Sequence, residues 1–294
     1  MDNKSVVVIG AGPAGIATAI QLKRSNIEPV LLEQGEIGGL LRNANLVENY
    51  PGFPDGITGL DLVQRFKEQL KNTGVTVSFE RVAELEYRDE LFFTKTSKRI
   101  IRSDVAVIAT GTKPMITPVP AVSDEIKNRI FYEIYPILGI KNKNIVIVGA
   151  GDAAFDYALN LSENNEVTIL NRSEQSSCLP LLLERCMKSD NISYLHNVDV
   201  SEICDEGLYL SVKCISNDNR KKNQIKTDYV IFATGREPCL DFLGSEFNTN
   251  FEYLIRSNRF YMIGDVKNEI FRQTAICVGD GIKAAMKIYN TLGR

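Results

Sequence analysis

Closely spaced glycines after a β-branched run can bind the pyrophosphate of a dinucleotide, and the chain begins with such a stretch. After the apolar residues 6–9, the small residues are Gly10, Gly12, Pro13, Ala14 and Gly15. In this pattern the first glycine forms a tight turn, the second lets the backbone approach the phosphates, and the third permits close helix packing. The following helix would aim its N-terminus at the phosphates. Glu33 ends the next predicted strand, about twenty residues further on, where an acid binds the ribose hydroxyls.

A second, weaker copy of the pattern follows the β-branched residues 145–148. Its residues are Gly149, Gly151, Asp152 and Ala153. Ala154 replaces the third glycine, and no acid ends the next strand. Together the two copies predict two dinucleotide sites in one chain.

The predicted strands beside the two glycine patterns are also similar to each other. Two apolar strands end in Ala-Thr-Gly, at residues 105–111 and 229–235, and each leaves through a proline. Glycine permits unusual backbone angles and proline favours an extended exit, so these segments are expected to be paired crossings between two domains. The sequence thus predicts an α/β fold with two Rossmann-like dinucleotide-binding domains, one inserted into the other. A β-rich meander is expected in each domain, from residues 75 and 208 onward.

The composition excludes several classes of protein. The 294 residues suit two domains, and a net charge of −3 provides no basic field for nucleic acid. No apolar run approaches the roughly eighteen residues of a membrane span. A cytoplasmic protein without nucleic-acid or membrane partners is therefore expected.

The six cysteines lie at irregular spacings in the second half, and no CxxC pair is present. This pattern supports neither a zinc site nor a sequence-adjacent redox dithiol. Cys178 and Cys186 are expected to be packing residues, with a reactive-thiol role as the alternative, and Cys277 is expected to be buried in a helix. The single histidine, His196, is interpreted as a partly exposed strand residue rather than a metal ligand.

With these motifs in place, the chain resembles the low-molecular-weight thioredoxin reductase family and its relatives, the thioredoxin-reductase-like ferredoxin-NADP reductases. The resemblance covers nearly the whole chain and rests on loops at residues 38–41 and 48–54 and on motifs at 264–266, 272–275 and 279–281. The two crossings place an inserted domain at residues 114–235 within an outer domain of residues 1–113 and 236–294, and the resemblance implies that the outer domain binds FAD and the inserted domain binds NAD(P). It also implies a homodimer, with hinges at Gly111 and Gly235 that let the inserted domain rotate.

The resemblance also assigns roles to single residues. Asp265 would bind the ribityl chain of FAD, and the backbone after Arg272 and Gln273 would approach the isoalloxazine ring. The FAD contacts that it implies beyond the first fingerprint and Glu33 are Gly39, Leu40, Leu41, Asn49, Val82, Thr110, Gly111, Gly264, Asp265, Arg272, Gln273 and Ala275. The NAD(P) contacts that it implies are Gly149, Gly151, Asp152, Ala153, Arg172 and Gly235.

The chain departs from the family at the redox dithiol. Counting back from Gly149 places the CxxC motif of thioredoxin reductases on Tyr132 and Tyr135. A disulfide relay needs one thiolate to attack and a second to resolve, and tyrosine does neither. Two interpretations of these tyrosines stay open, one in which they stack on the flavin and one in which they pack in the core. Tyr50 is a further candidate for flavin stacking, and no residue is assigned as a catalytic acid or base.

The nicotinamide side is altered too. Family members that use NADPH carry a histidine and several arginines after the second strand, and here only Arg172 remains, after Asn171. An acidic residue in place of Asn171 would be typical of NADH binding, and it is absent. The sequence therefore leaves three possibilities open: the domain binds NADPH, it binds NADH, or it has lost nicotinamide binding.

These observations predict an FAD-dependent oxidoreductase that passes electrons between NAD(P)H and a partner such as ferredoxin or flavodoxin, without an internal disulfide. The basic residues available for such a partner are Lys141, Lys143, Arg220, Lys221 and Lys222. The alternatives are an NAD(P)H oxidase or diaphorase with a small-molecule acceptor, a disulfide reductase that uses partner thiols, and a flavoprotein that NAD(P)H does not reduce. This last class contains both a ferredoxin-fed enzyme and a non-catalytic FAD sensor or scaffold.

Overall fold

The computed structural model describes residues 5–116 and 124–292, which contacts divide into two compact units. The first unit takes the described residues up to Arg42, residues 47–113 and those from Glu237 onward. The second unit takes residues 43–46 and the described part of 114–236. The tetrapeptide 43–46 therefore groups with the second unit, although the chain on both sides of it belongs to the first.

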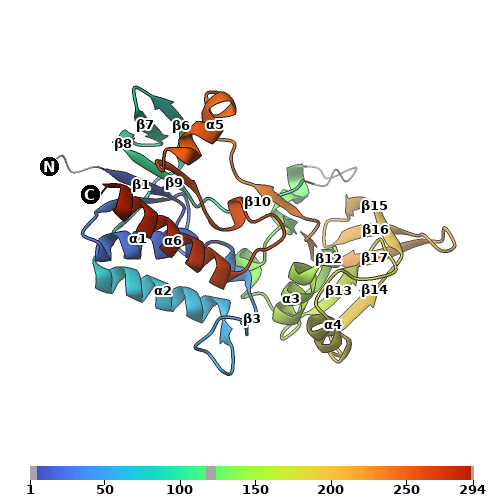
Figure 1. Ribbon diagram of the computed structural model, residues 1–294. Helices are drawn as coiled ribbons and strands as arrows, with labels where there is room; N and C mark the ends of the chain where they lie inside the picture. Colours follow the sequence, from blue (N-terminus) through green and yellow to red (C-terminus); the bar gives the residue numbers. More distant parts are fainter. Residues whose placement is uncertain (1–4, 117–123, 293–294) are drawn as a thin grey trace. The chain divides into compact units, whose positions relative to one another are not determined.

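A parallel sheet forms the centre of the first unit (Figure 1). Within the described residues, its strands are, from edge to edge, β20 (Phe260–Met262), β9 (Val105–Ile108), β1 (Val6–Ile9), β2 (Pro29–Glu33) and β5 (Val77–Phe79). Strands β1 and β9 are buried along their whole length, as expected for parallel strands covered on both faces. The carboxyl ends of β1 and β2 bring the first glycine turn and Glu33 to one edge of this sheet.

Helices α1 (Pro13–Arg24) and α6 (Thr274–Leu292) lie side by side in this unit (Figure 1). Gly281 permits their close approach, because a Cβ built on it would collide with the carbonyl oxygen of Ala14. Helix α2 (Gly59–Thr73) begins after Thr58, whose hydroxyl accepts a hydrogen bond from the Asp61 N–H, and ends at Gly74 in the left-handed conformation. The first unit also contains α5 (Phe247–Arg256) and the antiparallel strands β6 (Val82–Arg88), β7 (Leu91–Thr96) and β8 (Ile100–Ser103).

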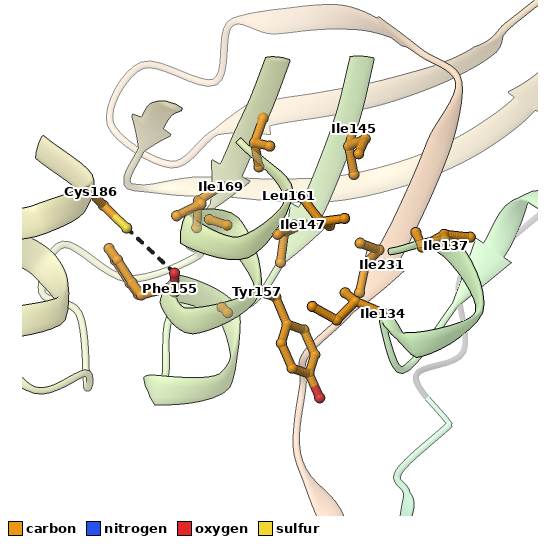
Figure 2. Packing of buried hydrophobic residues seen from close by; sticks show 13 residues of the cluster. Ile134, Ile137, Ile145, Ile147, Phe155, Tyr157, Leu161, Ile169, Cys186 and Ile231 are labelled. Carbon is orange, nitrogen blue, oxygen red and sulfur yellow. Dashed lines mark hydrogen bonds between the residues drawn. The ribbon is translucent and has the colours of Figure 1, made fainter. Parts of the chain in front are cut away.

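The second unit repeats this plan. Its described parallel strands are, in order, β11 (Ile130–Phe131), β18 (Tyr229–Phe232), β12 (Asn144–Val148), β13 (Glu166–Leu170) and β14 (Ile192–Leu195). Helices α3 (Asp152–Leu161) and α4 (Pro180–Met187) pack on it, and Figure 2 shows Phe155 and Leu161 of α3 against Ile147 and Ile169 of the sheet. The antiparallel strands are β15 (Val198–Asp205), β16 (Leu210–Ser216) and β17 (Lys222–Thr227). In each sheet the fingerprint strand lies beside the strand that ends in Ala-Thr-Gly.

Short elements complete the described chain. Strand β10 (Thr112–Pro114) pairs with β19 (Arg236–Pro238), where the chain passes from one unit to the other. The remaining strands are β3 (Leu46–Val47) and β4 (Ile57–Thr58), and the 3₁₀ helices are η1 (Gly39–Asn43), η2 (Asp124–Arg129), η3 (Tyr135–Ile137) and η4 (Gly264–Val266).

Three local expectations from the sequence are wrong. The first meander does not begin near residue 75, because β5 pairs parallel with β2 and the antiparallel strands start at β6. The second meander does not begin at residue 208, because β15 already starts at Val198. His196 is an exposed residue one position beyond β14 rather than a partly exposed strand residue. In each case the bounds of the strand depend on its pairing with a neighbour, which a short apolar run does not reveal.

Candidate functional site

The first glycine turn is so tightly packed that it has no room for a side chain at Gly10 or Gly15. Gly10 has a φ of 106°, and a Cβ built on it would collide with the carbonyl oxygen of Ala109, in the Ala-Thr-Gly segment after β9. A Cβ on Gly15 would collide with the carbonyl oxygen of Gly10. The turn therefore folds tightly against the neighbouring strand and presses the first turn of α1 onto it.

Bare backbone lies in front of the N-terminus of α1. The helix begins at Pro13, and no side chain caps it. A Cβ built on Gly12 would have only the Gly39 Cα near it, at 4.0 Å, and a Cβ on Gly39 would lie 3.3 Å from the Gly12 Cα. The free N–H groups of the first turn and this glycine-lined cradle fit a pyrophosphate, because side chains at these positions would fill the space.

Glu33 is held in place by the backbone of the turn. Its Oε2 accepts a hydrogen bond from the Ala11 N–H at 2.8 Å, and its Oε1 accepts one from the Gly35 N–H at 2.9 Å. Each carboxylate oxygen can accept a further bond. The partly exposed carboxylate is thus oriented by the turn and can still accept hydrogen bonds from a ligand, and its contact with ribose hydroxyls stays a prediction.

The motif at residues 264–266 is hydrogen-bonded to Asp280 of α6. Asp280 Oδ2 accepts hydrogen bonds from the Gly264 N–H at 3.1 Å and from Asn268 Nδ2 at 2.8 Å. The pKa of Asp280 is lowered, since these bonds and Lys267 outweigh the opposing effect of burial. Asp265, next to Gly264, is partly exposed and accepts a hydrogen bond from the Cys277 thiol at 3.1 Å.

The other residues predicted to contact FAD all lie in the first unit. Leu40 and the buried Leu41 are in η1, and Val82 begins β6. Asn49 Nδ2 donates to Gln273 Oε1 at 2.8 Å, so two of the predicted flavin loops are in direct contact. Arg272 and Gln273 precede α6, and Ala275 lies in its first turn.

Tyr50 and Thr110 each have a local structural role. The Tyr50 ring packs on Phe53 and Phe66, with centroids 6.2 Å apart in both pairs, and burial raises the pKa of its hydroxyl. Thr110 Oγ1 donates to the Cys239 carbonyl oxygen at 2.7 Å, next to Gly111, whose φ is 62°.

The second glycine turn repeats the geometry of the first. Gly149 has a φ of 128°, and a Cβ built on it would collide with the carbonyl oxygen of Ala233, in the second Ala-Thr-Gly segment. Ala154, at the third glycine position, is completely buried. Helix α3 also begins without a side-chain cap, at Asp152 and Ala153, which are exposed. The second turn thus has the backbone that a dinucleotide site needs despite its weaker sequence pattern.

The loop after β13 is folded by Asn171. Asn171 Oδ1 accepts a bond from the Ser173 N–H at 3.0 Å, and its Nδ2 donates to the Gln175 carbonyl at 3.0 Å and the Tyr194 hydroxyl at 2.8 Å. Its side chain is 5% exposed, and both hydrogens of its Nδ2 are donated inside the protein. Arg172 is exposed, and within the described chain its guanidinium forms no ion pair.

The end of this loop returns to the second glycine turn. The Leu179 N–H donates to Asp152 Oδ1 at 2.7 Å, and the Ser177 N–H donates to the Ala150 carbonyl at 3.0 Å. The loop and the turn therefore form one fixed surface. Gly235, which is predicted to contact NAD(P), has a φ of 119°.

The two tyrosines at the dithiol positions are anchored within the second unit. The Tyr132 ring lies 5.8 Å from the Phe232 ring and packs against a cluster of buried side chains, which favours the interpretation as a core residue. The N–H groups of Ile134 and Tyr135 both donate to Asn43 Oδ1, at 3.0 and 2.9 Å.

Two polar residues that no sequence pattern singles out form hydrogen bonds or ion pairs with this segment. Asn43, 2% exposed, belongs to the tetrapeptide 43–46, and Glu133 pairs with Arg236 at 3.1 Å. Both depend on partners about a hundred residues away in sequence, so no local pattern reveals them.

The described cysteines form no disulfide. All six are free in the described part of the chain. Cys186 is buried in α4, where its thiol donates to the Phe155 carbonyl at 3.5 Å (Figure 2), and burial raises its pKa to about 12. Cys178 is partly buried against the same core, as expected for a packing residue. Cys277 is buried in α6, as the sequence predicts.

The predicted basic residues are not all available to a partner. Lys143 Nζ pairs with Asp228 at 3.3 Å. Arg220, Lys221 and Lys222 are exposed around the turn between β16 and β17, and Lys141 is exposed before β12. Across residues 5–116 and 124–292, no group of histidine, cysteine and acidic side chains is arranged to hold a metal ion, and no helix is long and apolar enough to cross a membrane.

Comparison with known proteins agrees with this architecture. A family model described as pyridine nucleotide-disulphide oxidoreductase matches residues 4–281. The thioredoxin reductase of Chlamydia pneumoniae is 27% identical, with 100% of both chains covered. The structure of Lactococcus lactis thioredoxin reductase superposes with a TM-score of 0.88 and 26% identity, and that of T. acidophilum thioredoxin reductase with 0.85 and 27%, each covering 98% of both chains. The predicted α/β fold with two Rossmann-like domains and the predicted family resemblance are confirmed.

Proposed function

Because the chain belongs to the pyridine nucleotide-disulphide oxidoreductase family, we propose that it transfers electrons from NADPH to a small redox protein, such as ferredoxin or flavodoxin, without a dithiol of its own. Family membership establishes an FAD-dependent pyridine nucleotide oxidoreductase. The acceptor, the preference for NADPH and the absence of a thiol step are the proposal.

FAD and a pyridine nucleotide are the cofactors of this family, in agreement with the two glycine fingerprints. FAD supplies a group that takes up a hydride and releases electrons singly or in pairs. In the proposed assignment, the N-terminus of α1 and Gly12 bind its pyrophosphate, Glu33 binds the adenosine ribose, and Asp265 binds the ribityl chain. These residues bind and orient the cofactor, and none of them is required as an acid or base.

The observation that carries the proposal is the occupation of the dithiol positions by tyrosine. Tyr132 packs on Phe232 in the core, and the backbone at Tyr135 is held by Asn43. Thiol–disulfide exchange requires a thiolate. Burial raises the pKa of Cys186 to about 12 and that of Cys214 to about 11, so neither thiol is suited to that step. Because tyrosines occupy the dithiol positions and the described cysteines form no disulfide, direct transfer from the flavin to the partner is the simplest route.

Arg172 supports the preference for NADPH. Asn171 stands where an acid would bind the 2′-hydroxyl of NADH, and its carboxamide is already used within the loop. The exposed guanidinium of Arg172 beside it offers a positive charge and several donors, which suit a 2′-phosphate.

The test is an anaerobic titration of the purified FAD-loaded protein with NADPH and with NADH, followed by addition of oxidised ferredoxin or flavodoxin. We expect NADPH to bleach the flavin absorbance and the acceptor to restore it. A variant in which Cys178, Cys204 and Cys239 are replaced by serine should retain the same rates, because no thiol takes part.

Three results would contradict the proposal. If neither nucleotide bleaches the flavin, the protein is not an NAD(P)H reductase. Rapid oxygen consumption without a carrier would indicate an oxidase. Reduction of thioredoxin or of a small disulfide that is lost in the serine variant would show that the protein uses its own thiols.

The homodimer and the cytoplasmic location also belong to the proposal, since they rest on the resemblance alone. Sedimentation of the FAD-loaded protein at micromolar concentration should give about twice the mass of the 32.8 kDa chain. A monomer under these conditions would remove the homodimer from the proposal.

A further inference from the structure

Cys277 occupies an unusual position for a thiol in this molecule. It lies in the first turn of α6, is 6% exposed, and donates its hydrogen to Asp265 Oδ1 at 3.1 Å. Asp265 is partly exposed, and no other described side chain donates to its carboxylate. One carboxylate oxygen is therefore fixed from inside the protein, while the other remains available to a ligand.

The surroundings of Cys277 fix its direction. A Cβ built on Gly264 would lie 3.3 Å from the Cys277 Sγ and 2.9 Å from the Cβ of Ala14. The thiol is thus packed where η4, α1 and α6 of the first unit meet. Asp280, on the next turn of α6, holds the Gly264 N–H at 3.1 Å. Helix α6 therefore makes two hydrogen bonds to the turn at residues 264–266. Asp280 accepts one from the Gly264 N–H, and Cys277 donates the other to the Asp265 carboxylate.

A redox role for this thiol is disfavoured by its environment. Burial, together with the carboxylates of Asp265 and Asp280, raises the pKa of Cys277 far above its usual value. The sulfur remains protonated and acts as a hydrogen-bond donor rather than a nucleophile. A hydrogen bond to an ionised carboxylate is stronger than one between neutral groups, so the thiol can orient Asp265 effectively.

We propose that Cys277 is a positioning residue whose thiol orients the Asp265 carboxylate, so that the second carboxylate oxygen faces a hydroxyl of the polyol chain of FAD. The inference rests on the proposed FAD site. It adds a role for a residue that belongs to none of the binding motifs, and it makes the donor property of the side chain, rather than its volume, the feature that matters.

The test compares Cys277→Ala, which removes the donor, with Cys277→Ser, which keeps one. The readout is the Kd of the apoprotein for FAD, measured from the quenching of flavin fluorescence. We expect about a tenfold increase in Kd for the alanine variant, which corresponds to about 1.4 kcal/mol, and a Kd close to that of the wild type for the serine variant. Cys186→Ala is the matched control, because Cys186 is also buried in a helix with its thiol donating to an oxygen, but lies in the second unit.

A double-mutant cycle separates positioning from packing. Once Asp265→Asn has weakened FAD binding, adding Cys277→Ala should cause little further weakening, because both changes disrupt the same contact. The unfolding midpoint of each apoprotein, measured in parallel, identifies variants that have lost their fold. If Cys277→Ala destabilises the core, the Kd of the folded Cys277→Ser variant still tests the proposal.

The possible outcomes are distinct. If Cys277→Ala binds FAD as tightly as the wild type, or if a folded Cys277→Ser is as weak as alanine, the positioning role is overturned. Additive effects of the two substitutions would also overturn it. If Asp265→Asn itself leaves the Kd unchanged, the assignment of Asp265 to FAD fails, and with it the part of the proposed function on which this inference rests.

Discussion

Arg172, in the loop after β13, is proposed to bind the 2′-phosphate of NADPH. Arg172→Ala should raise the Kd for NADPH between about tenfold and a hundredfold, since it removes charge-assisted hydrogen bonds to the 2′-phosphate. The Kd for NADH should change little. The rate of flavin bleaching, measured at increasing nucleotide concentration, gives both Kd values from its saturation. Arg65→Ala, which removes an exposed arginine from α2 of the first unit, is the control. Equal weakening of both nucleotides would show that Arg172 does not bind the phosphate.

The partly buried carboxylate of Asp156 gives a prediction about pH. Asp156 accepts a bond from the Asn45 N–H at 3.0 Å, and burial raises its pKa from 3.8 to about 6, with a smaller contribution from Asp152 and an opposing one from the Asn45 bond. The folded protein therefore holds this proton more tightly than the unfolded chain does. The contribution of Asp156 to stability is greatest below pH 4 and declines as the pH rises from about 4 to about 6.

Asp156→Asn keeps an acceptor for Asn45 and removes the cost of ionisation. At pH 8 it should raise the free energy of unfolding by up to about 3 kcal/mol, from about two pKa units at 1.36 kcal/mol each, and at pH 4 it should have little effect. Urea denaturation at both pH values provides the measurement. Asp190→Asn, at an exposed position, controls for the lost charge. A gain in stability that is equal at both pH values would contradict the explanation.

The residue scale also shows what a sequence can and cannot reveal. The glycines, Glu33 and Arg172 follow fixed spacings from predicted strands, so their places in the structure could be predicted. Asn43 and the partner of Cys277 could not be, because each depends on a contact between segments far apart in the chain. The choice between core and flavin for Tyr132 likewise needed the position of Phe232.

At the scale of the element, the two glycine turns form an internal comparison. The third small residue is Gly15 in the first copy, where a Cβ would collide with the Gly10 carbonyl, and a buried alanine, Ala154, in the second. Gly15→Ala should therefore destabilise the first unit by about 3 kcal/mol or more and reduce its FAD content. Ala154→Gly should cost only about 1 kcal/mol, the price of glycine in a helix.

Thermal unfolding and the ratio of FAD to protein after purification measure both effects. If Gly15→Ala retains wild-type stability and FAD content, the collision is relieved by a backbone shift and the two turns are more alike than their sequences suggest.

The strands were less predictable than the turns. Central strands such as β1 and β9 are continuous apolar runs between glycines, and the sequence places them correctly. The strand β5 is a short, half-exposed segment at the edge of its sheet, and only its parallel pairing with β2 separates it from the antiparallel meander. Periodicity cannot supply that distinction, since short strands in both kinds of sheet have similar composition.

For the whole molecule, the crossings between the units provide a test of hinge motion. Gly111 has a φ of 62°, and nothing lies within 4 Å of a Cβ built on it, so a substitution there adds backbone restraint without a steric clash. Gly235, with a φ of 119°, is the other proposed hinge. If the second unit must rotate during turnover, Gly111→Ala and Gly235→Ala should slow flavin reduction by NADPH severalfold while FAD binding remains normal.

Stopped-flow absorbance at saturating NADPH gives the rate. Gly207→Ala is the matched control for Gly111→Ala, because Gly207 also has a positive φ, 77°, and open space around it, but lies in the turn between β15 and β16, whereas a Cβ on Gly235 would lie 3.2 Å from Met115 Sδ. Rates that are the same in all three variants would remove these glycines as hinges.

The tetrapeptide 43–46 has a consequence for any attempt to divide this protein. A fragment cut at the two Ala-Thr-Gly crossings would lack Asn43 and Asn45, which serve Ile134, Tyr135 and Asp156. Two backbone N–H groups and a partly buried carboxylate would lose their partners in the excised piece. Such a fragment should fold poorly alone and recover when a short peptide spanning residues 43–46 is supplied in trans, so the second unit is a complementation system rather than a separable module.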